Sequence, residues 1–241
     1  MKKINWNDVR LVLMLGIVVF LYSFSSGRNE TRLFKAADIK FTPADVDFIT
    51  HDKVNKLLIQ NYDRVTSIRK DKLDLNKVEK TLEENPMIEK AEVYTTIDGK
   101  LKAQVRQKTP IARVYEGVTS YYVDRNGKEM PLSETFTARV PLVTGALDKI
   151  EKENLHALLI YIYNDDFLKK NIIGIEIRPS GNIRMLNRNY DYEILFGKTV
   201  NMEKKFNNYK AFLQDAVKDT LIENYKTINL KFTQQVVCTK K

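Results

Sequence analysis

Residues 85–112 read NPMIEKAEVYTTIDGKLKAQVRQKTPIA, and this pattern predicts a β-hairpin that follows the end of a helix. Asn85-Pro86 ends the helical pattern, because proline cannot continue a helix and restricts the residue before it. Apolar and polar residues alternate on both sides of Asp98-Gly99, as in two half-buried strands joined by a turn. A three-residue loop that places Ile97 opposite Leu101 keeps apolar residues facing one another, so we expect this register.

The chain on the N-terminal side of this hairpin predicts one strand and two helices. Residues 37–42 alternate apolar with polar side chains, which is typical of a half-buried strand. Thr50 is a suitable N-cap for a helix that follows it, and a second helix is expected to begin near Asp74. Together with the hairpin, these elements predict the order strand, helix, helix, strand, strand for residues 35–113.

A long apolar segment near the N-terminus predicts a membrane span. Residues 9–27 contain an uninterrupted apolar run, and about 19 helical residues reach roughly 28 Å, close to the hydrocarbon thickness of a bilayer. A cleaved signal peptide is the alternative, since Lys2 and Lys3 precede the run, but no Ala-x-Ala pattern follows it. We expect residues 1–8 to be a cytoplasmic tail, residues 28–34 a linker, and the remaining chain to lie across the membrane.

The composition limits the classes of partner and chemistry. The chain has 241 residues, 43% of them hydrophobic, which is a globular composition with room for one or two domains. Its net charge of +9 favours nucleic acid, an anionic membrane or an acidic polymer as partner, although an exported domain rarely meets nucleic acid. A single cysteine, Cys238, excludes an intrachain disulfide. Two histidines, His51 and His156, leave no His/Cys cluster for zinc, so we expect no metal and no cofactor.

Adjacent carboxylates at Asp165-Asp166 are the candidate for acid/base chemistry, as in a membrane-anchored hydrolase of the cell wall. Hydrolysis of a glycosidic bond requires two carboxyl groups that flank it. Side chains of adjacent residues diverge, and this pair follows a predicted helix at about residues 149–163, so a solvated helix end is the simpler interpretation. The sequence therefore predicts no catalytic residue and a protein that acts by binding.

Several motifs in a fixed order resemble those of one family. Residues 85–93, 101–105 and 107–112 resemble the pattern of a POTRA domain. They follow a single N-terminal anchor, as in the POTRA-containing cell division proteins of the FtsQ/DivIB family. Further segments are similar to the second domain of that family: residues 121–127, 140–145, 194–198 and 228–232.

The resemblance implies an α+β fold with three parts. These are a single N-terminal transmembrane helix, a POTRA domain (β-α-α-β-β) over residues 35–113, and a second, mainly-β domain with two helices over residues 114–241. The second of these helices has an apolar stripe at helical spacing. The stripe consists of Met202, Phe206, Tyr209, Leu213 and Ala216.

The resemblance also implies a function. It points to a non-enzymatic bitopic scaffold of the bacterial divisome, which links early and late division proteins and helps control septal peptidoglycan synthesis by binding FtsB and FtsL. Such a protein lies in the inner membrane at the septum, with its N-terminus cytoplasmic and its C-terminal domains periplasmic. The alternative is a POTRA chaperone-like module in outer-membrane protein assembly or secretion. That class usually continues into a long barrel of alternating strands, whereas two helices interrupt the strands predicted here.

The end of the chain is the expected partner-binding site. A terminal strand at the edge of a sheet leaves N–H and C=O groups free for a partner strand, and the resemblance implies that FtsB adds such a strand. The matching positions are Phe232, Thr233, Gln234, Gln235, Val236 and Val237. Alternation within one continuous strand places Ile228, Leu230, Phe232, Val236 and Cys238 on one face. Phe232, Val236 and Cys238 are therefore open to a second interpretation, as ordinary core residues.

Overall fold

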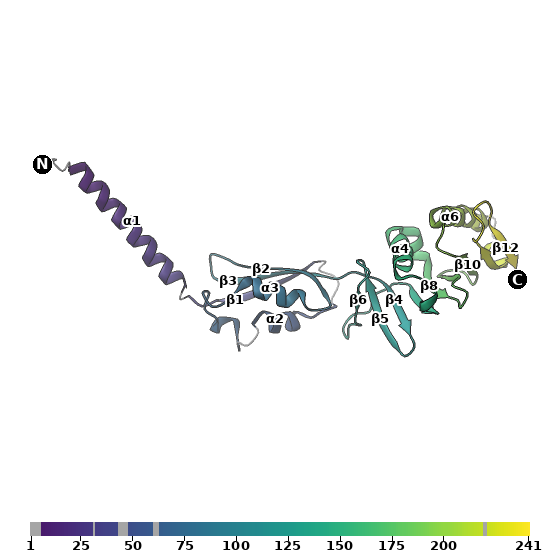
Figure 1. The fold of residues 1–241 in the computed structure, drawn as a ribbon, viewed down its shortest axis with the longest axis horizontal. Helices are drawn as coiled ribbons and strands as arrows, with labels where there is room; N and C mark the ends of the chain where they lie inside the picture. Colours follow the sequence, from purple (N-terminus) through teal and green to yellow (C-terminus); the bar gives the residue numbers. More distant parts are fainter. Residues whose placement is uncertain (1–5, 31, 43–47, 60–62, 219–220) are drawn as a thin grey trace. The chain divides into compact units, whose positions relative to one another are not determined.

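The computed structural model describes residues 6–30, 32–42, 48–59, 63–218 and 221–241. The chain is divided into two compact units, Met1–Gln107 and Lys108–Lys241. Both contain helices and strands (Figure 1), so the predicted α+β class is confirmed. The boundary expected after Arg113 falls inside β4 (Pro110–Glu116), which pairs with strands of the second unit. The segment that resembles the closing strand of a POTRA domain therefore opens the next sheet.

The first unit begins with α1 (Trp6–Glu30). Within it, Val9–Arg28 has a mean hydropathy of 2.0 and is not buried against the protein. A helix that is apolar all round and exposed requires an apolar surrounding, because water around so many apolar side chains is unfavourable. One N-terminal apolar helix of this kind is the feature of a single-pass membrane protein.

The rest of the first unit has the predicted element order. Its elements are β1 (Ala36–Thr42), α2 (His51–Ile59), the 3₁₀ turn η1 (Val65–Ser67), α3 (Leu75–Glu83), β2 (Ile88–Thr95) and β3 (Lys100–Gln107). The sheet order is β1-β3-β2, with β1 parallel and β2 antiparallel to β3. Thr50 and Asp74 begin the helices as predicted, since their side chains accept the N–H groups of Lys53 (3.3 Å) and Lys77 (3.2 Å).

The β2–β3 hairpin differs from the predicted register by two residues. Leu101 pairs with Thr95, and its expected partner Ile97 lies in the loop. Thr96 closes this loop, because its N–H donates to Lys100 O (2.9 Å) and its Oγ1 accepts the N–H of Lys100 (3.0 Å). A shift of two residues keeps every side chain on the same face of the sheet, so alternation alone cannot distinguish the two registers.

The second unit is a nine-stranded sheet with helices α4 (Lys152–Asn164), α5 (Asp166–Asn171) and α6 (Met202–Lys218). The strand order is β12-β11-β10-β9-β8-β7-β4-β5-β6. Its strands besides β4 are β5 (Thr119–Asp124), β6 (Glu129–Met130), β7 (Leu142–Gly145), β8 (Ile172–Ile177), β9 (Ile183–Asn187), β10 (Glu193–Gly197), β11 (Tyr225–Asn229) and β12 (Val237–Lys240).

One helix face closes the core of this unit. The predicted α6 stripe is buried at Phe206, Tyr209, Leu213 and Ala216. Tyr209 is also the centre of a buried polar network, in which its hydroxyl contacts Tyr192 Oη (2.8 Å) and accepts Asn187 Nδ2 (2.9 Å). The network fixes α6 against β9 and β10, because buried polar groups are stable only when they are hydrogen-bonded.

We expect this network to make the protein sensitive to alkaline pH. Burial raises the pKa of the Tyr192 and Tyr209 phenols above their ordinary value near 10. The unfolded chain then loses these protons first, so the contribution of these two tyrosines to stability is constant below about pH 10 and declines above it. Urea unfolding followed by circular dichroism between pH 8 and 11 should show this decline. The variant with both tyrosines replaced by phenylalanine should show a smaller decline, and an equal decline in that variant would contradict the assignment.

Candidate partner-binding edge

The second unit ends in an edge strand. β12 pairs antiparallel with β11, with Cys238 opposite Ile228, and no strand among the described residues lies on its other side. In Figure 1 the C-terminus lies beside β12. A strand in this position presents N–H and C=O groups that a further strand can pair with.

The hydrogen bonds of β12 show which N–H groups point outward. Lys241 N–H donates to Asn224 O (2.8 Å), so it faces β11. Because backbone N–H groups alternate in direction along a strand, the N–H of Val237, four residues earlier, faces β11 as well. The N–H groups of Cys238 and Lys240 consequently point away from the sheet. These are the two donors that β12 can offer to a partner.

The chain does not continue as one strand from Ile228 to Cys238, and that expectation is wrong. β11 ends at Asn229, whose side-chain Oδ1 accepts the N–H of Lys231 (3.0 Å) and so starts a turn. The chain then reverses and returns as β12. Alternation cannot be carried through a turn, because the period of two holds only for extended backbone.

The six predicted partner-binding residues lie in and after this reversal. Phe232 to Val236 form the connection between β11 and β12, and Val237 is the first residue of β12. Thr233 holds the connection to α6, since its carbonyl accepts Asn208 Nδ2 (3.0 Å). The structure thus brings these residues to the same corner of the sheet as the outward donors of β12.

The interpretation of Phe232, Val236 and Cys238 as core residues holds for two of them and not for the third. Phe232 is 53% exposed, so it is not a core residue. Val236 and Cys238 are partly buried and pack against the core. Burial also raises the pKa of the Cys238 thiol. The residues that sequence reasoning missed are the outward donors Cys238 and Lys240, and the signal that could have found them is the short alternation after Val237.

Comparison with known families agrees with this architecture. The family model described as FtsQ/DivIB, C-terminal related, matches residues 109–239, which is more than half of the chain. The chain belongs to the FtsQ/DivIB family. A POTRA-like domain model matches residues 39–106. No curated protein matches the chain. These two matches confirm the predicted resemblance. Proteins of the FtsQ/DivIB family are non-enzymatic scaffolds of cell division.

This FtsQ/DivIB protein has another edge strand whose donors are already occupied. In the POTRA-like sheet, β2 is an edge strand. The N–H of Val93 donates to Glu79 Oε1 (2.6 Å) and the N–H of Ala91 donates to Glu83 Oε1 (3.2 Å). Both glutamates come from α3, one helical turn apart. A strand that added to β2 would have to displace two carboxylates, since each outward N–H can serve one acceptor well.

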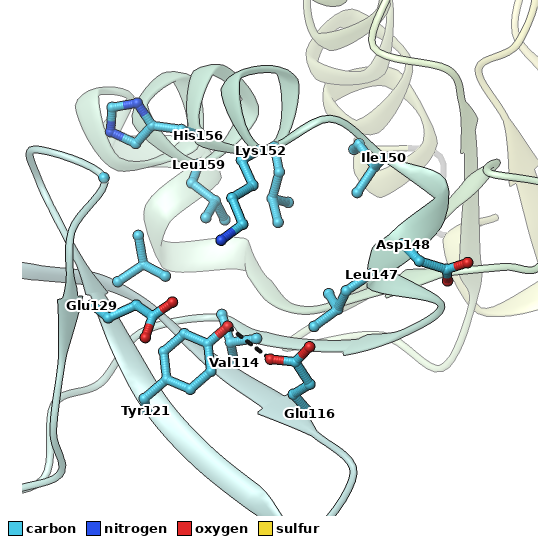
Figure 2. Close-up of a pocket in the computed structure, with 13 residues that line it drawn as sticks. Val114, Glu116, Tyr121, Glu129, Leu147, Asp148, Ile150, Lys152, His156 and Leu159 are labelled. Atoms are coloured by element: carbon cyan, nitrogen blue, oxygen red, sulfur yellow. Dashed lines mark hydrogen bonds between the residues drawn. The ribbon is translucent and has the colours of Figure 1, made fainter.

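A cavity of about 250 Å³ lies between β4, β5 and α4 (Figure 2). Its lining includes apolar residues such as Val114 and Leu159 and the carboxylates of Glu116 and Glu129. Figure 2 shows Lys152 pointing into the cavity, whereas His156 points away from it. Among the lining residues, the Tyr121 hydroxyl donates to Glu116 Oε2 (3.3 Å).

The other candidate chemical groups have structural roles. Asp165 caps α5 by accepting the N–H of Leu168 (3.0 Å), and it also pairs with Lys210. His156 contacts Arg125 O through Nε2 (3.2 Å), and the ring of His51 lies 4.4 Å from that of Phe41. Within the described residues, no three His, Cys, Asp or Glu side chains are grouped to hold a metal ion.

Proposed function

We propose that this protein is a single-pass scaffold of the bacterial divisome that binds FtsB and FtsL through residues 232–237 and β12. Through these partners it helps control septal peptidoglycan synthesis. The observation that carries the proposal is the edge position of β12 in a chain of the FtsQ/DivIB family. The cavity next to α4 is a separate feature and is not part of this proposal.

The exposed groups at this corner define the partner segment. An extended segment of FtsB would accept the N–H groups of Cys238 and Lys240 with its carbonyl oxygens. Phe232 supplies an apolar anchor, because it is more than half exposed beside the edge. Exposed lysines surround the edge at positions 226, 231, 240 and 241. A segment with acidic side chains would complement this charge and associate faster than a neutral one.

The difference between the two edges supports β12 as the binding strand. Two outward N–H groups of β2 are held by Glu79 and Glu83, so strand addition there must first break two charge-assisted hydrogen bonds. No side chain of the described residues is bonded to the outward N–H groups of Cys238 and Lys240. β12 can therefore accept a strand without losing an existing contact.

The same proposal includes the topology of the protein. Residues 1–8 form a cytoplasmic tail, residues 9–27 the span and residues 28–34 a linker to the periplasmic parts. The POTRA domain, which ends with the first unit at Gln107, contacts earlier division proteins, and the second unit binds FtsB and FtsL. Lys2 and Lys3, on the N-terminal side of the span, support this orientation.

Replacing Phe232 with alanine should weaken FtsB binding about tenfold, because an exposed aromatic anchor of this kind contributes more than 1 kcal/mol to an interface. The fold should be unaffected, since the side chain is already exposed. The measurement is the affinity of the full-length protein in nanodiscs for FtsB. Tyr94→Ala is the matched control, because Tyr94 is 41% exposed and lies in the other unit. Equal affinities of both variants would remove Phe232 from the site.

Depletion of the protein distinguishes the proposed function from the alternatives. Long filaments without septa are expected for a division scaffold. Mislocalised outer-membrane proteins in cells that still divide would instead support the POTRA chaperone-like module, and altered glycan fragments would support a hydrolase. A fluorescent fusion should gather at midcell, and an even distribution along the membrane would contradict the proposal.

A further inference from the structure

Three segments that are far apart in the sequence meet where the first unit follows the membrane span. Residues 32–35, 68–70 and 97–100 are joined by backbone hydrogen bonds. Their donor and acceptor pairs are Phe34 N to Ile68 O (3.1 Å), Lys70 N to Arg32 O (3.0 Å) and Lys35 N to Gly99 O (2.9 Å). This end of the unit is consequently one continuous surface, built from the start of the domain, the loop before α3 and the β2–β3 turn.

The surface carries three cations that have no carboxylate partner among the residues that the structure describes. Arg32, Lys35 and Lys70 form no ion pair among the described residues. The acidic groups beside them are already paired. Asp71 is held by Arg69 through two hydrogen bonds (2.9 and 2.8 Å), and Asp98 pairs with Lys100 (3.4 Å). Three cations therefore remain available for an external anion.

An apolar tip lines the same hollow as these cations. Ile97 is fully exposed, with a relative exposure of 100%. Next to it, Gly99 has φ +88, and the space that a side chain would occupy is bordered by carbon atoms of Lys35 (3.7 Å) and Lys70 (3.8 Å). The aliphatic stems of both lysines thus flank the turn. Arg32, Lys35, Lys70 and Ile97 all line one open hollow of about 510 Å³.

The chain itself keeps this surface close to the bilayer. The apolar segment Val9–Arg28 ends four residues before Arg32. Four residues reach at most about 14 Å even when fully extended. Arg32 must therefore lie within or next to the lipid headgroup region, however the unit is oriented on the span. The hydrogen bond from Lys70 to Arg32 brings the loop before α3 along with it.

We propose that this juxtamembrane cluster, consisting of Arg32, Lys35, Lys70 and Ile97, binds anionic phospholipid of the membrane that α1 crosses. The three cations contact headgroup phosphates, and Ile97 enters the boundary with the acyl chains. An apolar tip ringed by cations fits this interface better than a soluble anion, which would leave Ile97 in water. The cluster would hold the POTRA-like unit at a defined distance from the bilayer. This proposal does not depend on partner binding by β12.

The test uses the full-length protein in nanodiscs with a fluorophore that responds to its surroundings. The fluorophore is attached to the cysteine of an Ile97→Cys variant that also carries Cys238→Ser, so that only position 97 is labelled. The apolar fluorophore then takes the place of the apolar Ile97 side chain. The discs contain either phosphatidylglycerol mixed with phosphatidylcholine or phosphatidylcholine alone. Val118→Cys gives the matched control, since Val118 is also a fully exposed apolar residue at a hairpin tip.

The anionic discs should shift the emission at position 97 towards that of an apolar environment, and the shift should weaken at 0.5 M salt. Each cation near an anionic surface contributes roughly fivefold to the docked population, so three contribute about a hundredfold. The variant Arg32→Gln, Lys35→Gln, Lys70→Gln should therefore lose the shift, while its circular dichroism stays unchanged. The proposal is overturned by equal emission in both lipids, by an equal shift at position 118, or by a shift that the triple variant retains.

Discussion

FtsB binding should fall about thirtyfold when Lys240 is replaced by proline, because the change removes an outward donor and places a ring at the pairing edge. One lost backbone hydrogen bond and the accompanying steric conflict cost about 2 kcal/mol. The ladder between β11 and β12 should survive, since the Lys240 N–H points away from β11. The effect is measured as the affinity of the full-length protein in nanodiscs for FtsB. The midpoint of unfolding of the variant should equal that of the unchanged protein.

Two further variants make this result specific. Lys240→Ala keeps the donor and removes the charge, so it should bind within about threefold of the unchanged protein, as expected for a charge at the rim of an interface. Val237→Pro removes an N–H that faces β11, so it should destabilise the edge strand itself. If Lys240→Pro and Lys240→Ala bind FtsB equally well, strand addition to β12 is not the mode of binding.

Replacing Gly145 with alanine should lower the free energy of unfolding of the second unit by about 4 kcal/mol, near the upper end for single substitutions. Gly145 ends β7 with φ +100, and a Cβ there would lie 2.1 Å from the carbonyl oxygen of Ile177 on β8. That oxygen already accepts the N–H of Ala146 (2.7 Å), so it cannot move away freely. The motif at residues 140–145 thus requires glycine at its last position because β7 and β8 approach each other closely there.

Gly117→Ala is the control for this substitution. Gly117 also has a positive φ, +61, but no atom lies within 4 Å of the Cβ position. Gly117→Ala should lower the free energy of unfolding by only about 1 kcal/mol, the cost of a left-handed backbone conformation for a residue with a side chain. Labelling of Cys238, which lies in the second unit, reports unfolding of that unit over a urea series at constant pH. Equal midpoints for both variants would show that the close approach to Ile177 is not what selects glycine.

The helices of this protein follow from local pattern. The apolar run within α1 needs no tertiary partner to be identified, because its length alone matches a bilayer. The buried stripe of α6 was predictable for a related reason, since residues at helical spacing share a face. Thr50 and Asp74 likewise act on backbone groups three residues away, so their capping role is visible in the sequence.

Register and connectivity were less predictable. The β2–β3 hairpin differs from expectation by two residues, because that shift exposes and buries the same side chains. The reversal after Asn229 was missed because one side-chain hydrogen bond ends the strand there, while the alternation of apolar residues continues past it. The predicted segment from Phe232 to Val237 therefore lies at the same corner of the sheet as the outward donors of β12 but does not include them.

The sequence by itself determined the membrane span, the order of the elements from β1 to β3, the family and the absence of an intrachain disulfide, because these depend on composition and on neighbours within a few residues. Only the tertiary structure decided that β12 is the edge strand and that β2 is capped by Glu79 and Glu83. It also decided that Arg32, Lys35, Lys70 and Ile97 line one hollow. Such contacts join segments tens of residues apart, and their geometry depends on how the sheets and helices pack, which no local period specifies.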